Sequence, residues 1–377
     1  MLLLLLSCGP SGPSVLPAEV VFSGEGRLEH TRTGPAWSDP NVDVGAVTWV
    51  RGRSEVEDGL LGPGRTAPDE IAAYLPGTVA QLLVRMEGEV PAGAWVTLTG
   101  TWESGEPFAA QRLPLAPQVS WSLQVPERLD KLSLTLSYEL PDVGPYRSEH
   151  ILVTTWDTPL EGTPLYRRPL LWMAEWGAGT PSRSVTPLEA QSEVENELTL
   201  KALRGLYQLG IDEGRTYGSF PRPKEKDNQA HVFLDHPQCA CGEYRGILLN
   251  LVEEQGIDGN WVMMYFRNPS TDALSMYETR KISAVGTEPK VWQHWNHVAV
   301  EVNGQVYDPT YNLHHPDFPS YEDDLFEHYC YGENEKCKTP GGWCQQPRPE
   351  GTCIDNPPGF DPEGPEGAMR VKRGDKY

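Results

Sequence analysis

The sequence predicts two folded parts of different class, an all-β part of sandwich type followed by an α+β part. Short alternating apolar runs separated by Pro and Gly fill residues 18–157 and are typical of a β-sandwich-like domain. Residues 241–256 instead repeat apolar side chains at helical spacing, and residues 296–308 alternate around an Asn-Gly pair. At 377 residues the chain is also too long for one ordinary core, which favours two domains.

Composition and charge narrow the class of protein and of partner. Hydrophobic residues make up 38% of the chain and 12 are Trp, so a wholly disordered chain is excluded. The formal net charge is -22, from 31 Lys and Arg against 53 Asp and Glu. A phosphate backbone requires basic side chains, so we expect no nucleic-acid partner and no docking on an anionic membrane by charge alone.

The N-terminus resembles a bacterial lipoprotein signal. Five Leu at positions 2–6 precede Ser7-Cys8-Gly9, a pattern in which Cys8 would be lipidated, and residues 1–17 would be signal and tether. The apolar run is short and lacks a preceding Lys or Arg, so an ordinary signal peptide is the alternative. No later stretch approaches the roughly 18 apolar residues of a membrane helix. We expect an exported protein, either secreted or a periplasmic or outer-membrane-tethered lipoprotein that meets the membrane through its lipid anchor.

The first domain, residues 18–157, contains no motif that indicates chemistry, so we expect a spacer or a module that binds carbohydrate or protein. Its clearest strands are expected at residues 20–22, 47–50, 95–99, 121–125 and 132–138. Residues 158–185 are expected to connect the domains, with an apolar patch at 170–173 that packs on a neighbouring domain.

A helix is then expected from Thr186 to Gly210, at the start of the second domain, residues 186–329. Thr186 is a suitable N-cap, Pro187 suits the first helical position, and Glu189 completes a capping box. Gly210 is a plausible C-terminal stop.

Four cysteines crowd the Pro- and Gly-rich extension of residues 330–377. Such a segment buries little apolar surface, so we expect disulfides as its staples. A zinc site is less favoured, because no C-x-x-C pair occurs. The three pairings of four cysteines stay open at this stage. The cysteines are Cys330, Cys337, Cys344 and Cys353.

Cys241 is expected at the N-terminus of a helix. Apolar residues recur at positions 244, 247, 248, 251 and 252, which lie on one helix face, and Gly256 ends the pattern. Unpaired N–H groups and the helix dipole at that end favour a thiolate, which predicts a reactive cysteine. The alternatives are an inert buried cysteine or a disulfide with Cys239, which would close a strained small ring.

His297 and Asp308 are expected on one face of a β-hairpin. Residues 297–302 alternate in polarity, and Asn303-Gly304 is a strong signal for a two-residue turn. Such a turn pairs residue 302 with 305, 301 with 306, 300 with 307 and 299 with 308. His297 and Asp308 are then diagonal neighbours, and the carboxylate can orient the imidazole.

These three segments together resemble the transglutaminase-like superfamily. Residues 241–249, with Gly256 and Ile257, resemble its nucleophile helix, residues 295–302 its histidine strand, and residues 307–310 its aspartate motif. The order Cys, His, Asp matches as well, over about residues 186–315. The resemblance implies a papain-like α+β core in which the Cys helix packs on an antiparallel sheet.

The resemblance also implies acyl transfer on a protein or peptide through a Cys241–His297–Asp308 triad, without metal or cofactor. Hydrolysis is the expected outcome (peptidase, amidase or deamidase), with cross-linking or an inactive binding or scaffold lipoprotein as alternatives. Gln238 is a candidate for the oxyanion or substrate groove, and the backbone N–H of Cys241 is an expected oxyanion donor. Trp292 and Trp295 are expected to line that groove or to belong to the core. His294 is a rival base, less favoured because it precedes the alternating strand.

Overall fold

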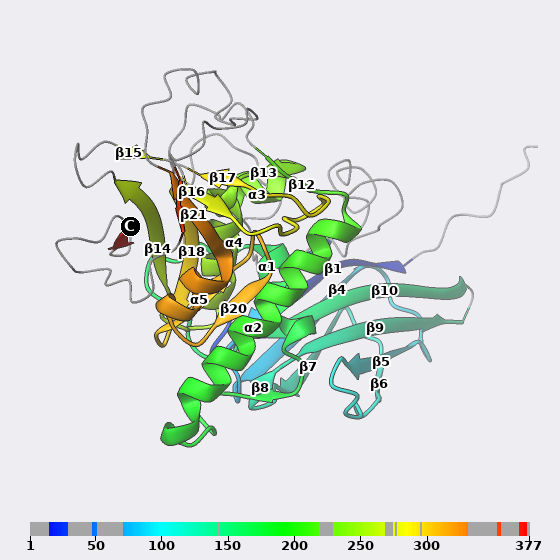
Figure 1. Cartoon of the computed structure of the whole chain (residues 1–377). Coiled ribbons are helices and arrows are strands. Elements are labelled where there is room, and N and C mark those ends of the chain that lie inside the picture. The colour runs from blue at the N-terminus through cyan, green and yellow to red at the C-terminus, as the bar shows by residue number, and fades with distance from the viewer. Residues whose placement is uncertain are drawn as a thin grey trace, which may run out of the picture. The chain divides into compact units, whose positions relative to one another are not determined.

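The computed structural model describes residues 15–28, 47–50, 71–141, 143–218, 229–267, 274–275, 277–294, 296–330, 353–355 and 369–374 (Figure 1). The chain divides into two compact units, one of residues 1–158 and 164–186 and one of residues 159–163 and 187–377. Strands predominate, and the described residues include five helices, so the fold is mixed α and β. Cys8, Trp295, Cys337 and Cys344 lie outside the described residues.

The first unit consists mainly of two sheets. One has the order β2-β1-β4-β7, with β1 (Val15–Ser23), β2 (Val47–Val50), β4 (Val79–Gly88) and β7 (Gln118–Gln124). The other has the order β3-β10-β9-β5-β6, with β3 (Ile71–Tyr74), β5 (Trp95–Trp102), β6 (Gln111–Pro114), β9 (Lys131–Leu140) and β10 (Val143–Thr154). A short pair joins β8 (Arg128–Leu129) to β11 (Thr180–Pro181). Four of the five expected runs fall within strands, namely β1, β2, β5 and β9, and the run 121–125 matches β7 except for its last residue.

Side-chain alternation explains why the two sheets share one core. Along β9, Leu132, Leu134, Leu136 and Tyr138 are buried, while the residues between them are exposed or half-buried. Buried residues of both sheets belong to a single hydrophobic cluster, the arrangement of a β-sandwich. Burial of one such leucine stabilises the fold by about 1.5–3 kcal/mol. The strand β3 pairs with β10 in parallel, so its sheet is mixed.

Helix α1 (Arg167–Trp176) occupies part of the range that was expected to be a connector. Leu170, Trp172 and Met173 are buried, and α1 contacts β3, β9 and β10. The apolar patch therefore packs on the sheet of its own unit, because residues 164–186 belong to the first unit rather than linking it to another.

The second unit contains a larger sheet of order β15-β14-β18-β19-β20, with β23 also paired to β14. Its strands are β14 (Asn260–Arg267), β15 (Leu274–Ser275), β18 (Asn296–Val302), β19 (Gln305–Asp308), β20 (Leu313–His315) and β23 (Met369–Gly374). A smaller sheet has the order β17-β16-β21-β22, from β16 (Tyr277–Thr279), β17 (Gln293–His294), β21 (Phe326–Cys330) and β22 (Cys353–Asp355). In that sheet the backbone register sets Cys330 opposite Cys353.

Helix α2 (Leu188–Asp212) differs from its expectation at both ends. Thr186 does not cap it, because its hydroxyl donates instead to the carbonyl of Ser182 at 2.8 Å. Pro187 occupies the N-cap position and offers no side-chain bond. The helix continues past Gly210, and Gly214 follows it with φ +67°, the left-handed conformation in which helices commonly end.

Helix α4 (Cys241–Glu253) begins at the residue that its apolar repeat predicted. It is buried on all sides rather than on one face, because it contacts α2, α3 (Gln229–Asp235), β14 and β18. Residues 242–253 are all buried, the polar Glu243 and Asn250 included. At its start the backbone N–H of Ala240 donates to Glu243 Oε2 at 2.8 Å, which is half of a capping box.

The β18–β19 hairpin has the predicted register, with Val300 opposite Tyr307 and Val302 opposite Gln305. Asn303 has φ 50° and Gly304 has φ 78°, as a two-residue turn of this kind requires. The side chain of Asn303 also donates to Glu195 Oε2 at 2.8 Å, which attaches the turn to α2.

Candidate active site

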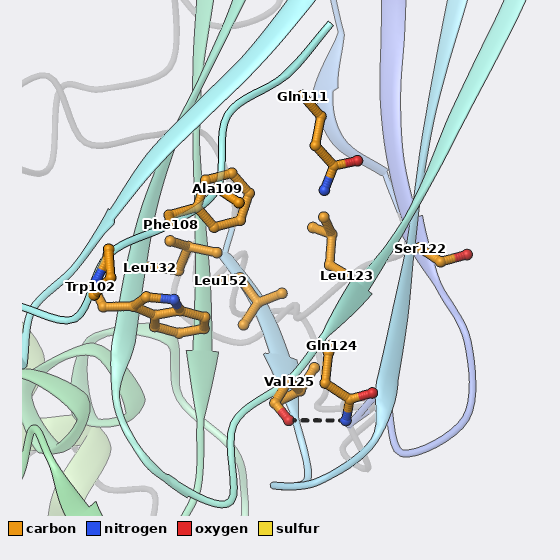
Figure 2. A pocket seen from close by; sticks show the side chains of 11 residues that line it. Trp102, Phe108, Ala109, Gln111, Ser122, Leu123, Gln124, Val125, Leu132 and Leu152 are labelled. Atoms are coloured by element: carbon orange, nitrogen blue, oxygen red, sulfur yellow. Dashed lines mark hydrogen bonds between the residues drawn. The ribbon is translucent and has the colours of Figure 1, made fainter. Parts of the chain in front are cut away.

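Two places in the described chain merit consideration as a site, and the first is a hollow of about 200 Å³ in the β-sandwich. Apolar side chains such as Phe108 surround it, and Gln111 extends into the space between the strands (Figure 2). Ser122 points away in the same view, and the Gln124 amide donates to the carbonyl of Val125 at 3.3 Å. The amide of Gln111, among mainly apolar side chains, does not indicate a particular ligand.

The second place is the start of α4, where Cys241 lies at the first helical position. Cys241 is a free cysteine and is partly exposed. The amides of Glu243 and Tyr244 donate to the Ala240 carbonyl at 3.1 and 3.2 Å. The amides of Cys241 and Gly242 are the first two of the helix, at the end whose N–H groups favour a negatively charged group. Strand β13 (Gln238–Cys239) leads into the helix and pairs in parallel with β12 (Thr216–Tyr217).

His297 on β18 and Asp308 on β19 are joined directly. Nε2 of His297 and Oδ2 of Asp308 are 2.7 Å apart, and both side chains are fully buried. The hairpin register explains this contact, since it sets the two residues on one face as diagonal neighbours.

The other ring nitrogen of His297, Nδ1, has different surroundings from Nε2. Within the described chain, Nδ1 is buried and makes no hydrogen bond of good geometry. Cys241 lies close enough to interact with the imidazole. The structure therefore brings Cys241, His297 and Asp308 together, with Asp308 on one ring nitrogen and the thiol near the ring.

Three donors orient the carboxylate of Asp308. Besides His297, the Tyr321 hydroxyl donates to Oδ2 at 2.6 Å, and the backbone N–H of Thr310 donates to Oδ1 at 2.9 Å. Tyr321 comes from α5 (Phe318–Leu325) and is fully buried. Sequence reasoning missed Tyr321, because a tyrosine in a short helix carries no local pattern that distinguishes this contact.

The charge state of His297 follows from these neighbours. Burial alone lowers the pKa of its imidazole, but the charge of Asp308, the hydrogen bond to it and the contact with Cys241 outweigh burial. The pKa of His297 is thereby raised from 6.5 to about 10. The ring is therefore an imidazolium at neutral pH, and it lies beside the Cys241 side chain.

Aromatic side chains from separate elements enclose this group. The Tyr311 ring lies 5.2 Å from that of His297, and the Tyr217 ring lies 6.2 Å from that of Tyr311. Trp292 meets Tyr217 edge to face at 5.0 Å. Tyr217, Trp292 and Tyr311 are all buried. Trp292 therefore belongs to the packed surround of the site, whereas Trp295 lies outside the described residues.

His294, the alternative candidate for the base, has a neutral ring that contacts Tyr311. Burial lowers its pKa well below the ordinary value, and the nearby His297 adds to the effect. Its Nε2 lies 2.6 Å from the Tyr311 hydroxyl, and its ring centroid is 4.8 Å from that of His297. His294 therefore lies beside His297, with its Nε2 next to a tyrosine hydroxyl rather than a carboxylate.

Cys239, Gln238 and His236, which precede Cys241, contact other parts of the fold. Cys239 is fully buried, and burial raises the pKa of its thiol to about 12, so it stays a thiol. Cys239 and Cys241 form no disulfide with each other. Gln238 is exposed, and its amide lies against Gly218, where an added Cβ would clash with Nε2. The backbone carbonyl of His236 accepts from Arg215 at 2.7 Å.

Comparisons of the sequence with family models and with curated proteins find no match. Among the described residues, no group of three or more His, Cys, Asp or Glu side chains is arranged to hold a metal ion. In the same part of the chain, no helix combines the length and apolar character needed to cross a bilayer. The case for function therefore depends on the geometry of this site.

Proposed function

We propose that Cys241, His297 and Asp308 form a nucleophilic triad that transfers acyl groups from amide substrates through a thioester. The observation that carries this proposal is the buried His297, bonded to Asp308 through Nε2 while Nδ1 has no hydrogen-bond partner of good geometry among the described residues. A core histidine with a purely structural role normally satisfies both nitrogens, because an unpaired buried polar atom costs about 1–3 kcal/mol.

The proposed reaction has two stages. The thiolate sulfur of Cys241 bonds to the amide carbonyl carbon, and the tetrahedral intermediate collapses as the C–N bond breaks. The imidazolium of His297 gives its proton to the departing amine, which leaves as a neutral product. In the second stage His297 takes a proton from water, and the resulting hydroxide attacks the thioester to release a carboxylic acid and regenerate Cys241.

The resemblance to the transglutaminase-like superfamily supports the same assignment, with a papain-like core as its fold. The buried α4 beside the antiparallel β14–β18–β19 strands is compatible with that core. Hydrolysis is the proposed outcome, since water is the acceptor that needs no second protein site. Export, with Cys8 as the lipidated residue, remains part of the proposal.

Alkylation by iodoacetamide at neutral pH tests whether the nucleophile exists. We expect Cys241 to react at least about tenfold faster than a model thiol peptide, because the ion pair supplies thiolate. Peptide mass spectrometry would locate the label, and His297→Ala should slow it to the rate of the model peptide. Equal rates in wild type and His297→Ala would overturn the proposal.

Hydrolysis and cross-linking are separated with one protein substrate. Fluorescein-labelled casein reports cleavage, and incorporation of dansylcadaverine into unlabelled casein reports amine transfer. We expect the first without the second, with Cys241→Ala as the control that abolishes both. Amine incorporation that exceeds cleavage would replace hydrolysis by transamidation as the function.

A further inference from the structure

Tyr217 is a buried hydroxyl at the nucleophile that the triad does not include. Strand β12 pairs in parallel with β13, so Tyr217 lies opposite Cys239, two residues before Cys241. Backbone hydrogen bonds hold this strand on both sides, from Gly218 N–H to the Cys239 carbonyl at 3.0 Å and from Tyr217 N–H to the Val285 carbonyl at 2.9 Å. The position of Tyr217 is therefore tied to the backbone that delivers the thiol.

The phenol ring has little freedom to turn away. Trp292 packs edge to face against it at 5.0 Å, and Tyr311 covers it at 6.2 Å. Only 6% of the residue is exposed. The hydroxyl of Tyr217 lies close enough to the Cys241 thiol for the two groups to interact. A donor held in this way requires no reorganisation when charge develops beside it, which is the property that makes an oxyanion site effective.

We propose that Tyr217 is a catalytic residue, whose hydroxyl donates to the Cys241 thiolate at rest and to the carbonyl oxyanion once the C–S bond forms. This inference rests on the proposed function and deepens it by naming the side-chain donor. The oxyanion is the oxygen attached to the carbon that bonds to sulfur. A donor that reaches the sulfur therefore needs to move little to reach that oxygen. The backbone N–H of Cys241 is the second donor.

The protonation state of Tyr217 suits this role. Burial raises its pKa well above the ordinary value, and the neighbouring Cys241, Tyr311 and Asp308 act in the same direction. Tyr217 therefore keeps its proton and acts as a hydrogen-bond donor. It never becomes a competing base.

The proposal separates two reactions of the same thiol. Acylation by 4-nitrophenyl acetate passes through an oxyanion as nitrophenolate leaves, whereas alkylation by iodoacetamide displaces iodide and forms no oxyanion. For Tyr217→Phe we expect acylation to slow about 100-fold, the effect of losing one oxyanion donor. Alkylation should change less than about fivefold, so the ratio of the two rates falls at least about 20-fold.

Tyr244→Phe is the matched control. Tyr244 is equally buried, on α4, and its hydroxyl has no hydrogen-bond partner among the described residues, so its loss should leave the rate ratio unchanged. Tyr217→Phe keeps the ring that packs against Trp292, so a purely structural role would also leave the ratio unchanged. Tyr217→Leu, which also lacks a donor, replaces Tyr217→Phe if the latter does not fold.

The outcomes separate this inference from the function on which it rests. Fast alkylation of wild-type Cys241, with a rate ratio in Tyr217→Phe equal to wild type, overturns the role of Tyr217 and leaves the triad intact. Slow alkylation of the wild type overturns the triad itself. A ratio that falls in Tyr217→Phe but not in Tyr244→Phe supports the oxyanion role.

Discussion

Replacement of Asp308 by Asn removes the charge at the centre of the proposed triad with almost no change of shape. The carboxylate accepts from His297, Tyr321 and the backbone of Thr310. An amide has one acceptor atom and one donor atom in place of two acceptors. If its oxygen faces Thr310, its NH₂ group faces His297, and Nε2 of a neutral ring must then accept. The ring proton moves to Nδ1, so the nitrogen near the thiol can no longer take a proton.

The size of the effect follows from the balance of forces on His297. Burial lowers its pKa, and it is chiefly Asp308 that raises the value from 6.5 to about 10. Without the carboxylate, burial dominates and the pKa of His297 falls below 6.5, so the ring becomes neutral at neutral pH. The equivalent change in a serine hydrolase triad lowers kcat about 10⁴-fold. We expect acylation of Cys241 in Asp308→Asn to slow by about 10³- to 10⁴-fold.

The burst of nitrophenolate from 4-nitrophenyl acetate measures this rate, and histidine NMR follows the ring. The imidazolium signals of His297 should persist to about pH 10 in the wild type and be absent at neutral pH in Asp308→Asn. Asp324→Asn, at an exposed carboxylate of α5, serves as the control for the substitution itself. An Asp308→Asn protein with a wild-type melting curve and an acylation rate within about threefold of wild type would refute the reasoning.

Three further results are expected. Tyr321→Phe removes one charge-assisted hydrogen bond from Asp308, so acylation should slow about tenfold and the free energy of unfolding should fall by about 1.5–3 kcal/mol in urea titrations; no change in either would contradict the contact. The pKa of His297 is raised on folding, so the stability it contributes is complete below pH 6.5 and is lost as the pH rises through about 10. Between about pH 7 and 8.5 the unfolded chain keeps a proton on the Cys241 thiol, which offsets this loss. Unfolding of the second unit should therefore weaken by up to about 1.4 kcal/mol per pH unit only between about pH 8.5 and 10, with a flatter profile in Asp308→Asn; the same slope in both proteins would count against it. Cys330 and Cys353 are opposite each other in the backbone register of an antiparallel pair, where the distance between Cα atoms is compatible with a disulfide. Non-reducing peptide mapping of exported protein should therefore find these two cysteines joined, and a disulfide from either one to another cysteine would contradict this.

The parts of the site that sequence reasoning predicted depend on near neighbours in the chain. The start of α4 at Cys241 follows from helix phase, and the His297–Asp308 contact follows from the register of a two-residue hairpin. Both patterns extend over fewer than about twenty residues, so periodicity and turn chemistry are sufficient to predict them.

The residues that complete the site arrive from elements without such patterns. Tyr217 lies on a two-residue strand, Tyr321 on a short helix, and Tyr311 in the turn after β19. Each reaches the triad by tertiary packing, and a lone tyrosine looks the same in any core. Residues 158–185 were expected to be a connector without a helix, yet they contain α1. That helix has no side-chain N-cap to mark it in the sequence, and its contacts are with the sheet of β3, β9 and β10.

In the N-terminal strands, burial could be predicted from local sequence but strand pairing could not. The alternating runs of β7 and β9 predicted a half-buried sheet, and both strands have that burial. The parallel pairing of β3 with β10 joins residues 71–74 to 151–154, and no local pattern indicates that partner. Pairing across such a distance is decided by how the whole core closes.

The turn at Asn303 narrows which amino acids that position tolerates. Its φ of 50° favours Gly, Asn or Asp, and its bond to Glu195 requires an amide donor. Gly would keep the conformation and lose the bond, while Asp would set two carboxylates against each other. Asparagine alone meets both demands, so among related chains with this hairpin, changes at residue 303 should be accompanied by changes at residue 195.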